Sequence, residues 1–297
     1  MSTNYLKLLA TGGALAASIS LSHILADGGL QAHVIAFFQA AGCAILLFVA
    51  DNTHSQFRFW PYAFISSLLG YTLPMMLVLT ALPHVGVGLS SLSYALPLLV
   101  TYCLNVMMDK HQLHWQKTLA VLTLTCGTGI YLGTSQYVEW QVNGTWLIIL
   151  LLSPISVGAA NVFRGMYYPV SQSSTRIAFQ TNLCSAAVLI PGLFTQDLSA
   201  LPNQPQLLIS LAALIGVAAL GQWFLFSLQR TASPVFVGQI GSVAMLFGGL
   251  CGVLFFNEPL SISQVSGLML ILCGAIIFSR TQHVKPKPEL LTQRSTI

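Results

Sequence analysis

The sequence predicts an all-α membrane protein with ten transmembrane helices, built as two inverted five-helix repeats. Its 297 residues are 55% hydrophobic and only 6% charged, with a mean hydropathy of +0.76, whereas an average soluble domain is about 25% charged. The charged residues separate apolar runs of about 20 residues, the length at which one helix crosses the hydrocarbon core. A weak internal repeat divides these runs into two sets of five.

Charged residues bound each predicted helix in turn. Single spans are predicted in the intervals 7–27, 27–51, 117–139, 139–164, 176–197, 197–230, 230–258 and 258–280. The longer interval 58–109 holds two spans, because the stretch ALPHVGVG at residues 81–88 interrupts its apolar run.

The Lys and Arg residues predict the orientation. With the N-terminus inside, all eleven fall on the cytoplasmic side, where short loops retain positive charge. We therefore expect a multi-pass protein of the cell inner membrane with both termini cytoplasmic. The net charge of +4 reflects this topology and does not indicate a nucleic-acid partner. The polar, proline-containing residues 281–297 are expected to form a disordered cytoplasmic tail.

The internal repeat lies at the ends of the two predicted units, residues 1–135 and 140–280. A shift of 147 residues lays LHWQKTLAVLTLTCGTGI (113–130) on LSISQVSGLMLILCGAII (260–277) without a gap, pairing Leu113 with Leu260, Cys126 with Cys273, Gly127 with Gly274 and Ile130 with Ile277. The same shift places His111, in an inner turn, opposite Glu258, in an outer turn. An inverted repeat requires this arrangement, and such repeats are typical of secondary transporters.

Two stretches carry a family resemblance. The second unit closes with FFNEPLSISQVSGLMLILCGAIIF (255–278), a turn followed by a glycine-bearing apolar helix, and TALPHVGVGLSSLSYALPLLV (80–100) carries Pro97 in its helix. The pattern resembles the EamA-like branch of the drug/metabolite transporter superfamily. This resemblance implies a ten-helix secondary transporter with alternating access, and it favours export over import. One departure is His111, where that family commonly repeats the turn glutamate.

Uncharged polar and aromatic side chains near mid-span are the candidate substrate site. A polar group facing lipid loses its hydrogen bonds to water, which costs several kcal/mol, so these side chains should face the protein interior or a cavity. The candidates are Gln39, Tyr71, Tyr94, Ser153, Asn182, Gln222, Trp223 and Gln239. For each, the alternative is hydrogen bonding or packing between helices.

The charge distribution narrows the substrate class. No charged residue lies near the centre of a predicted span, which favours a neutral or zwitterionic metabolite such as an amino acid, a vitamin or flavin, or a nucleobase-like compound. Neither a cofactor nor a metal is expected, since the six cysteines lie within spans and form no CxxC. Two other classes remain open. An intramembrane enzyme would need a nucleophile with its base, a metal cluster or paired carboxylates, and a receptor or assembly subunit would transport nothing.

Backbone residues indicate where helices bend or approach closely. Prolines inside spans produce kinks that serve as hinges, at Pro74, Pro97 and Pro154. Glycines at GxxxG spacing, Gly129 with Gly133 and Gly248 with Gly252, predict close packing within the bundle or, alternatively, a homodimer face.

Two residues at predicted outer ends are candidates for gating. Glu258 lies beside Pro259 in the last outer turn, and acts there either as a turn residue or as a charge at an outer gate. His23 lies toward the outer end of the first span and is either an interfacial structural residue or part of a proton step.

The proton-step hypothesis predicts that His23→Gln shifts the pH profile of transport, because glutamine does not titrate near neutral pH. Flux measured between pH 5 and pH 8 in sealed vesicles tests this prediction. An unchanged profile would remove His23 from the proton step.

Overall fold

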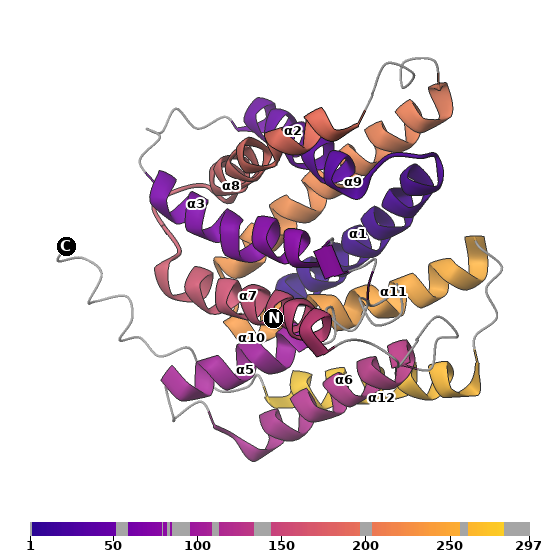
Figure 1. Cartoon of the computed structure of the whole chain (residues 1–297). Coiled ribbons are helices and arrows are strands. Elements are labelled where there is room, and N and C mark those ends of the chain that lie inside the picture. The colour runs from indigo at the N-terminus through magenta and orange to yellow at the C-terminus, as the bar shows by residue number, and fades with distance from the viewer. Residues whose placement is uncertain are drawn as a thin grey trace.

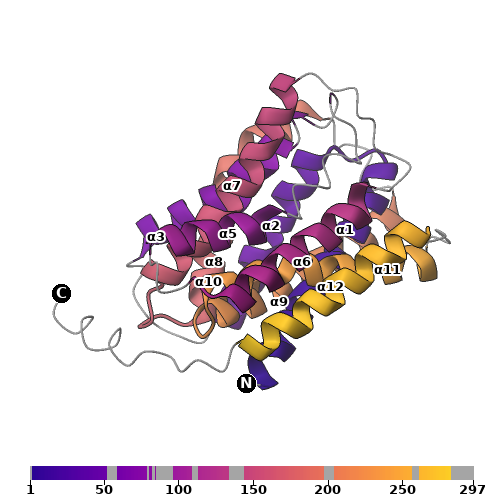
Figure 2. The same cartoon turned by 90° about the horizontal axis from the view of Figure 1, so that it is seen from below.

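A computed structural model describes residues 2–51, 59–78, 80–81, 84, 96–108, 113–133, 144–196, 204–255 and 261–281. This part of the chain is a bundle of helices in which no strand occurs (Figures 1 and 2). Its first half contains α1 (Ser2–Asp27), α2 (Ala32–Ala50), α3 (Trp60–Ser67), the π-helix η1 (Leu68–Thr72), α5 (Leu96–Met108) and α6 (Trp115–Gly133). Its second half contains α7 (Gly144–Tyr167), α8 (Ser174–Leu189), the 3₁₀-helix η4 (Ile190–Thr195), α9 (Pro205–Gln229), α10 (Pro234–Gly238), α11 (Ile240–Phe255) and α12 (Ile262–Thr281).

The helices have the length and composition of membrane spans. Seven helical segments in the described residues are long and apolar enough to cross a bilayer, and the apolar segments Leu96–Met108 and Pro234–Leu250 are shorter. At least one described helix lies in each of the nine intervals between charges. Large apolar side chains such as Val49, Ile148 and Ile209 are exposed on the outside of the bundle, which suits contact with lipid and not with water. The chain is therefore a multi-pass membrane protein.

Helix packing joins the two halves of the chain rather than separating them. The first long helix, α1, packs on α9 and α11, whereas α7 packs on η1 and α5. In the same way α2 contacts α8 and α9. Helices α6 and α12 lie side by side along one edge in both views (Figures 1 and 2). Each half therefore lacks a core of its own and completes it with helices of the other half.

Two glycines allow two of these contacts, with closely similar geometry. A Cβ added to Gly12 in α1 would lie 2.8 Å from Val243 Cβ and 3.2 Å from the backbone nitrogen of the next residue, in α11. A Cβ added to Gly158 in α7 would lie 2.8 Å from Val100 Cβ and 3.1 Å from the backbone nitrogen of the next residue, in α5. The distance of 2.8 Å at each site is shorter than real Cβ atoms show, so a larger residue at Gly12 or Gly158 would force the neighbouring helix to shift.

The α6–α12 contact is antiparallel and also depends on glycine. A Cβ on Gly127 would lie 2.8 Å from the carbonyl oxygen of Gly267, and one on Gly274 would lie 3.1 Å from that of Ala120. Neither Gly129 nor Gly248 has a heavy atom beyond its own helix within 4 Å. The prediction that these two glycines pack closely within the bundle was wrong, because their helix faces point away from the neighbouring helices. Gly127, Gly267 and Gly274 have that role instead.

The π-helix η1 interrupts the third helix just before Pro74. The N–H of Leu73 bonds the carbonyl of Leu68, five residues earlier. Pro74 has no N–H, so it cannot make the next bond of this kind to Leu69. The hydroxyl of Ser156, in α7, instead donates to the Leu69 carbonyl oxygen at 2.8 Å. An irregular backbone is thus stabilised inside the bundle by a side chain from the other half of the chain.

Gly127→Ala is expected to destabilise the protein by about 1–3 kcal/mol, because the added methyl group overpacks the α6–α12 contact. Gly129→Ala is the matched control in the same helix. It has open space and should be neutral or slightly stabilising, since alanine favours helix over glycine. Thermal unfolding in detergent compares the two variants, and equal melting temperatures would contradict this account of α6.

Candidate functional site

Polar side chains cross between the two halves of the chain in the interior of the bundle. We call these five contacts the polar seam: Asp51–Arg176, Ser66–Arg164, Ser67–Ser185, Leu69–Ser156 and Thr101–Asn161. In every pair the first residue belongs to α2, α3, η1 or α5 or directly follows one of them, and the second belongs to α7 or α8. Interior polar contacts of this kind line the interface between the halves without facing lipid.

One end of the seam carries two buried arginines, and we call it the arginine end. It contains the last residues of α2, α7 and α9 and the first residues of α3 and α8. Arg176 Nε lies 2.7 Å from Asp51 Oδ2, and both side chains are buried. Between α7 and α8, Tyr168 donates a hydrogen bond to Ser174. Burial raises the pKa of the Tyr168 hydroxyl, although that hydrogen bond and the charge of Arg230 act against the shift.

Arg164 is the second buried arginine and has no carboxylate partner in the described part of the chain. Its side chain is 5% exposed, one turn before the end of α7. Its Nε donates to Ser66 Oγ at 2.6 Å, and its Nη2 donates to the Ser66 carbonyl oxygen at 2.7 Å. The Cζ atom lies 5.3 Å from the ring centre of Phe226. A full positive charge is therefore held by neutral oxygens and an aromatic face.

One face of the third helix forms the surroundings of this guanidinium. Tyr62, Ser66 and Gly70 follow one another at intervals of four residues, so they lie along one side of α3 and η1. A side chain at position 70 would occupy the place of the guanidinium, because the nearest atoms to a Cβ there belong to Arg164. Tyr62 stacks on Phe163, with ring centres 5.4 Å apart, and interacts electrostatically with Arg164. Its buried hydroxyl has no hydrogen-bond partner among the described residues.

Buried glutamines supply further polar groups. Gln180 in α8 and Gln229 in α9 are 1% and 5% exposed, and neither amide makes a hydrogen bond within the described part of the protein. The Nε2 atom of Gln239, which joins α10 to α11, is also without a partner there. Natural proteins satisfy most buried amides, so each of these groups is open to a partner beyond the described residues, such as a water molecule or a ligand.

The predicted substrate residues occupy different settings. Tyr71 donates to the carbonyl of Ala36 in α2, and Asn182 donates to Ala178 within its own helix. Ser153 and Gln239 are buried, Gln39 and Gln222 are half-buried, and Trp223 is 40% exposed and packs edge-on against Phe224. Tyr94 lies outside the described residues.

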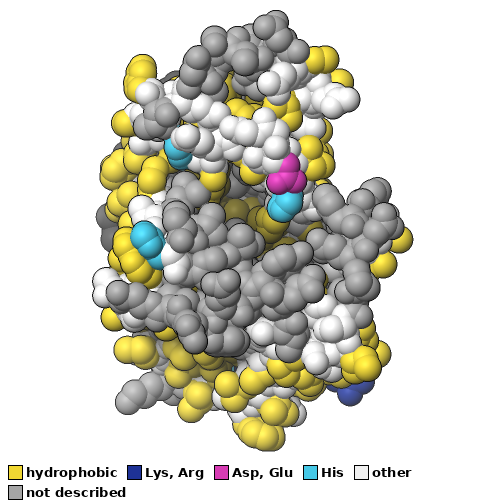
Figure 3. All heavy atoms as spheres, turned by 45° about the vertical axis from the view of Figure 1, so that its right-hand side comes forward, with side chains coloured by type: hydrophobic (Ala, Val, Ile, Leu, Met, Phe, Trp, Pro, Cys, Tyr) yellow, Lys and Arg dark blue, Asp and Glu magenta, His cyan; other side chains and the backbone are white. Residues whose placement is uncertain are grey.

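The predicted hinge and gate residues are equally dispersed. Pro74, Pro97 and Pro154 are all buried within helices. His23 Nδ1 lies 3.0 Å from Asp27 Oδ2, and both side chains are exposed at the end of α1 opposite the arginine end. Figure 3 shows a face where a histidine and an acidic side chain lie next to each other at the edge of a hollow with hydrophobic side chains inside it. Glu258 lies outside the described residues.

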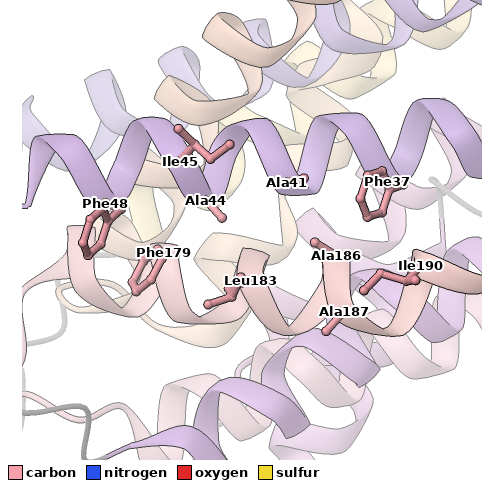
Figure 4. Close-up of a pocket in the computed structure, with 10 residues that line it drawn as sticks. All are labelled: Phe37, Ala41, Ala44, Ile45, Phe48, Phe179, Leu183, Ala186, Ala187 and Ile190. Atoms are coloured by element: carbon pink, nitrogen blue, oxygen red, sulfur yellow. The ribbon is translucent and has the colours of Figure 1, made fainter. Parts of the chain in front are cut away.

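A groove of about 490 Å³ between α2 and α8 contains no polar side chain among its lining residues. Figure 4 shows its walls, which come from Phe37, Ala41, Ala44, Ile45, Phe48, Phe179, Leu183, Ala186, Ala187 and Ile190. Neither hydrogen bonds nor charge are available there to orient a polar metabolite. The groove is therefore a lipid-facing surface and not the candidate site.

Sequence reasoning missed the arginine end. The sequence analysis placed Arg164 and Arg176 among the cytoplasmic loop charges, but both lie within helices and are buried. Charge spacing cannot distinguish an arginine that leaves a helix end from one that turns inward. The available signal was the spacing of Tyr62, Ser66 and Gly70, a small polar stripe on one helix face.

Known proteins define the class to which this architecture belongs. Residues 144–280 match the sequence profile of the EamA-like transporter family. The second half of the chain is therefore similar to the EamA-like transporter family, which confirms the resemblance to the drug/metabolite transporter superfamily. A solved structure described only as "Crystal structure of protein" has the same fold, with a TM-score of 0.73 and 16% sequence identity, over 94% of this chain and 98% of that chain. No curated protein sequence matches the chain.

Asp51→Asn is expected to destabilise the protein by about 3–5 kcal/mol, because it leaves the buried Arg176 without a charged partner. Asp27→Asn is the matched control, since its partner His23 is exposed and the same chemical change there should matter little. Thermal unfolding of both variants in detergent tests the difference. Similar losses in the two variants would show that the Asp51 pair has no special role in stability.

Proposed function

We propose that this protein is a secondary transporter in which two inverted five-helix units alternate access to a central site. The units are residues 1–135 and 140–280, and together they supply ten spans. The observation that carries this proposal is the pair of equivalent contacts made by Gly12 and Gly158 across the two units.

Those contacts are related as an inverted repeat requires. A shift of 146 residues brings Gly12 onto Gly158, and a shift of 143 residues brings Val100 onto Val243. The first helix of each unit thus meets the fourth helix of the other unit in the same way. Under the 147-residue shift, the contact between Gly127 and Gly267 likewise becomes the contact between Gly274 and Ala120. Two antiparallel helices that exchange contacts in this manner fit a two-fold axis in the membrane plane.

The polar seam fits a substrate pathway between the units. Its arginine end is closed by hydrogen bonds and an ion pair, so transport would require these contacts to open and to form again. The distribution of Lys and Arg supports a cytoplasmic location for that end at the inner membrane, with both termini inside. The candidate substrates remain a neutral or zwitterionic amino acid, vitamin or flavin, or nucleobase-like compound, with export favoured.

The substrate residues predicted from the sequence are part of the same proposal. Gln39, Tyr71, Tyr94, Ser153, Asn182, Gln222, Trp223 and Gln239 would line the site in one or other state of the cycle. Gln239 has the strongest support, because its buried amide nitrogen has no hydrogen-bond partner among the described residues. Rotation of half-buried Gln39 and Gln222 into an opened seam would add two further amides. A homodimer through the open glycine faces at Gly129 and Gly248 completes the proposal.

Proteoliposome flux of labelled L-leucine, L-phenylalanine, riboflavin and uracil tests the function. We expect at least one of these solutes to move saturably, compared with protein-free liposomes. No flux for any of them would favour the receptor or assembly class.

A reversible cross-link tests alternating access. The Oγ atoms of Ser67 and Ser185 are 2.8 Å apart across the two units, so Ser67→Cys with Ser185→Cys should form a disulfide on mild oxidation. Flux should fall at least tenfold when the bond forms and return when it is reduced, whereas either single variant should remain active. Full flux through a verified disulfide would contradict opening along the polar seam.

A further inference from the structure

We propose that Arg164 and the hydroxyl of Tyr62 bind the carboxylate of the transported solute, an inference that rests on the proposed transport function. The substrate class then narrows to small monocarboxylates or zwitterions with an apolar body. Neutral nucleobases are excluded as preferred substrates.

The positive charge of Arg164 is not balanced by a carboxylate among the described residues. The described residues contain two carboxylates, of which Asp51 pairs with Arg176 and Asp27 lies at the opposite end of the bundle. A buried guanidinium without a counter-ion is strongly destabilising. A chain that retains one needs it for a purpose that a neutral side chain does not serve, and an incoming anion supplies a negative charge that the described residues do not give to Arg164.

The Arg164 guanidinium and the groups around it have hydrogen-bonding capacity that the described residues leave unused. Both bonds of Arg164 go to one residue, Ser66, and they use Nε and Nη2. The hydrogen bonds of Arg164 to described residues leave Nη1 unused, and the Tyr62 hydroxyl has no hydrogen-bond partner among those residues. A carboxylate accepts from a guanidinium and a phenol together. Charge-assisted bonds of this kind are stronger than those to a neutral serine, so the ligand could displace Ser66.

The residues around the Arg164 guanidinium also favour a ligand with an apolar body. Gly70, in the π-helix, leaves the space that the guanidinium occupies, because a Cβ there would collide with Arg164. The ring of Phe226 lies against it and Tyr62 stacks on Phe163, and these rings suit an apolar substrate body. Because Ser66 is on α3 and Arg164 is on α7, exchange of Ser66 for substrate would also release a contact between the two units.

Matched acids and amides test the charge requirement. Binding is measured as the rise in melting temperature of the full-length protein in detergent, with L-leucine, L-phenylalanine and nicotinate against L-leucinamide, L-phenylalaninamide and nicotinamide. We expect at least one acid to bind about tenfold or more tightly than its amide. If none of the acids stabilises the wild-type protein more than its amide does, the inference is overturned.

Variants locate the site. Arg164→Gln should abolish the preference for acid over amide. Arg164→Lys should reduce this preference, because lysine keeps the charge but loses the forked geometry of the guanidinium. Tyr62→Phe keeps the ring but loses the hydroxyl, and it should weaken acid binding several-fold. Arg280→Gln removes an exposed arginine at the end of α12 and should change nothing. If Arg164→Gln does not fold, the effect of Tyr62→Phe on acid binding decides whether the carboxylate binds at this site. An acid preference that survives in Tyr62→Phe and in a folded Arg164 variant places the carboxylate elsewhere.

Flux of the same solutes in proteoliposomes separates this inference from the proposed function. Transport of a solute with no acid preference would reject the carboxylate site and leave the transporter intact. Acid-selective binding without flux of any solute would support the site and reject transport.

Discussion

The structure depends on the close approach of helices that belong to different halves of the chain. Gly12 against α11, Gly158 against α5 and Gly127 against α12 each bring a helix so near its neighbour that a methyl group would collide with it. In a membrane there is little hydrophobic gain from helix association, so packing at short range and hydrogen bonds must supply the stability. Such contacts, distributed across both halves, explain why neither half has a separate core.

Polar groups become usable inside this framework. The packed helices remove lipid from the seam, and the seam can then hold hydroxyls, amides and two guanidinium groups that lipid would exclude. The missing N–H of Pro74, the π-helix before it and the Ser156 hydroxyl illustrate the principle, since an irregular backbone is satisfied only because α7 lies against it. The same irregular turn provides the space for Arg164. Fold and candidate site therefore share one structural origin.

The proposed binding of a solute and the proposed opening of the seam share the contacts of the arginine end. Arg164 and Arg176 are both in the second half, and their partners Ser66 and Asp51 are both in the first half. A solute that takes the place of Ser66 would exchange a contact between halves for a contact with itself. The energy of binding would then go partly into releasing the closed end, which is how a ligand shifts a conformational equilibrium.

The sequence by itself determined the class of protein and the positions of its helices, because apolar runs bounded by charge leave few alternatives in a membrane. The match of residues 144–280 to the EamA-like family agrees with what was inferred from the closing turn and its glycine helix. Tertiary structure alone decided the direction in which side chains point. Arg164 looked like a loop charge and is buried, whereas Trp223 looked like an interior ring and is 40% exposed. Helix rotation depends on neighbours distant in sequence, and charge spacing does not encode it.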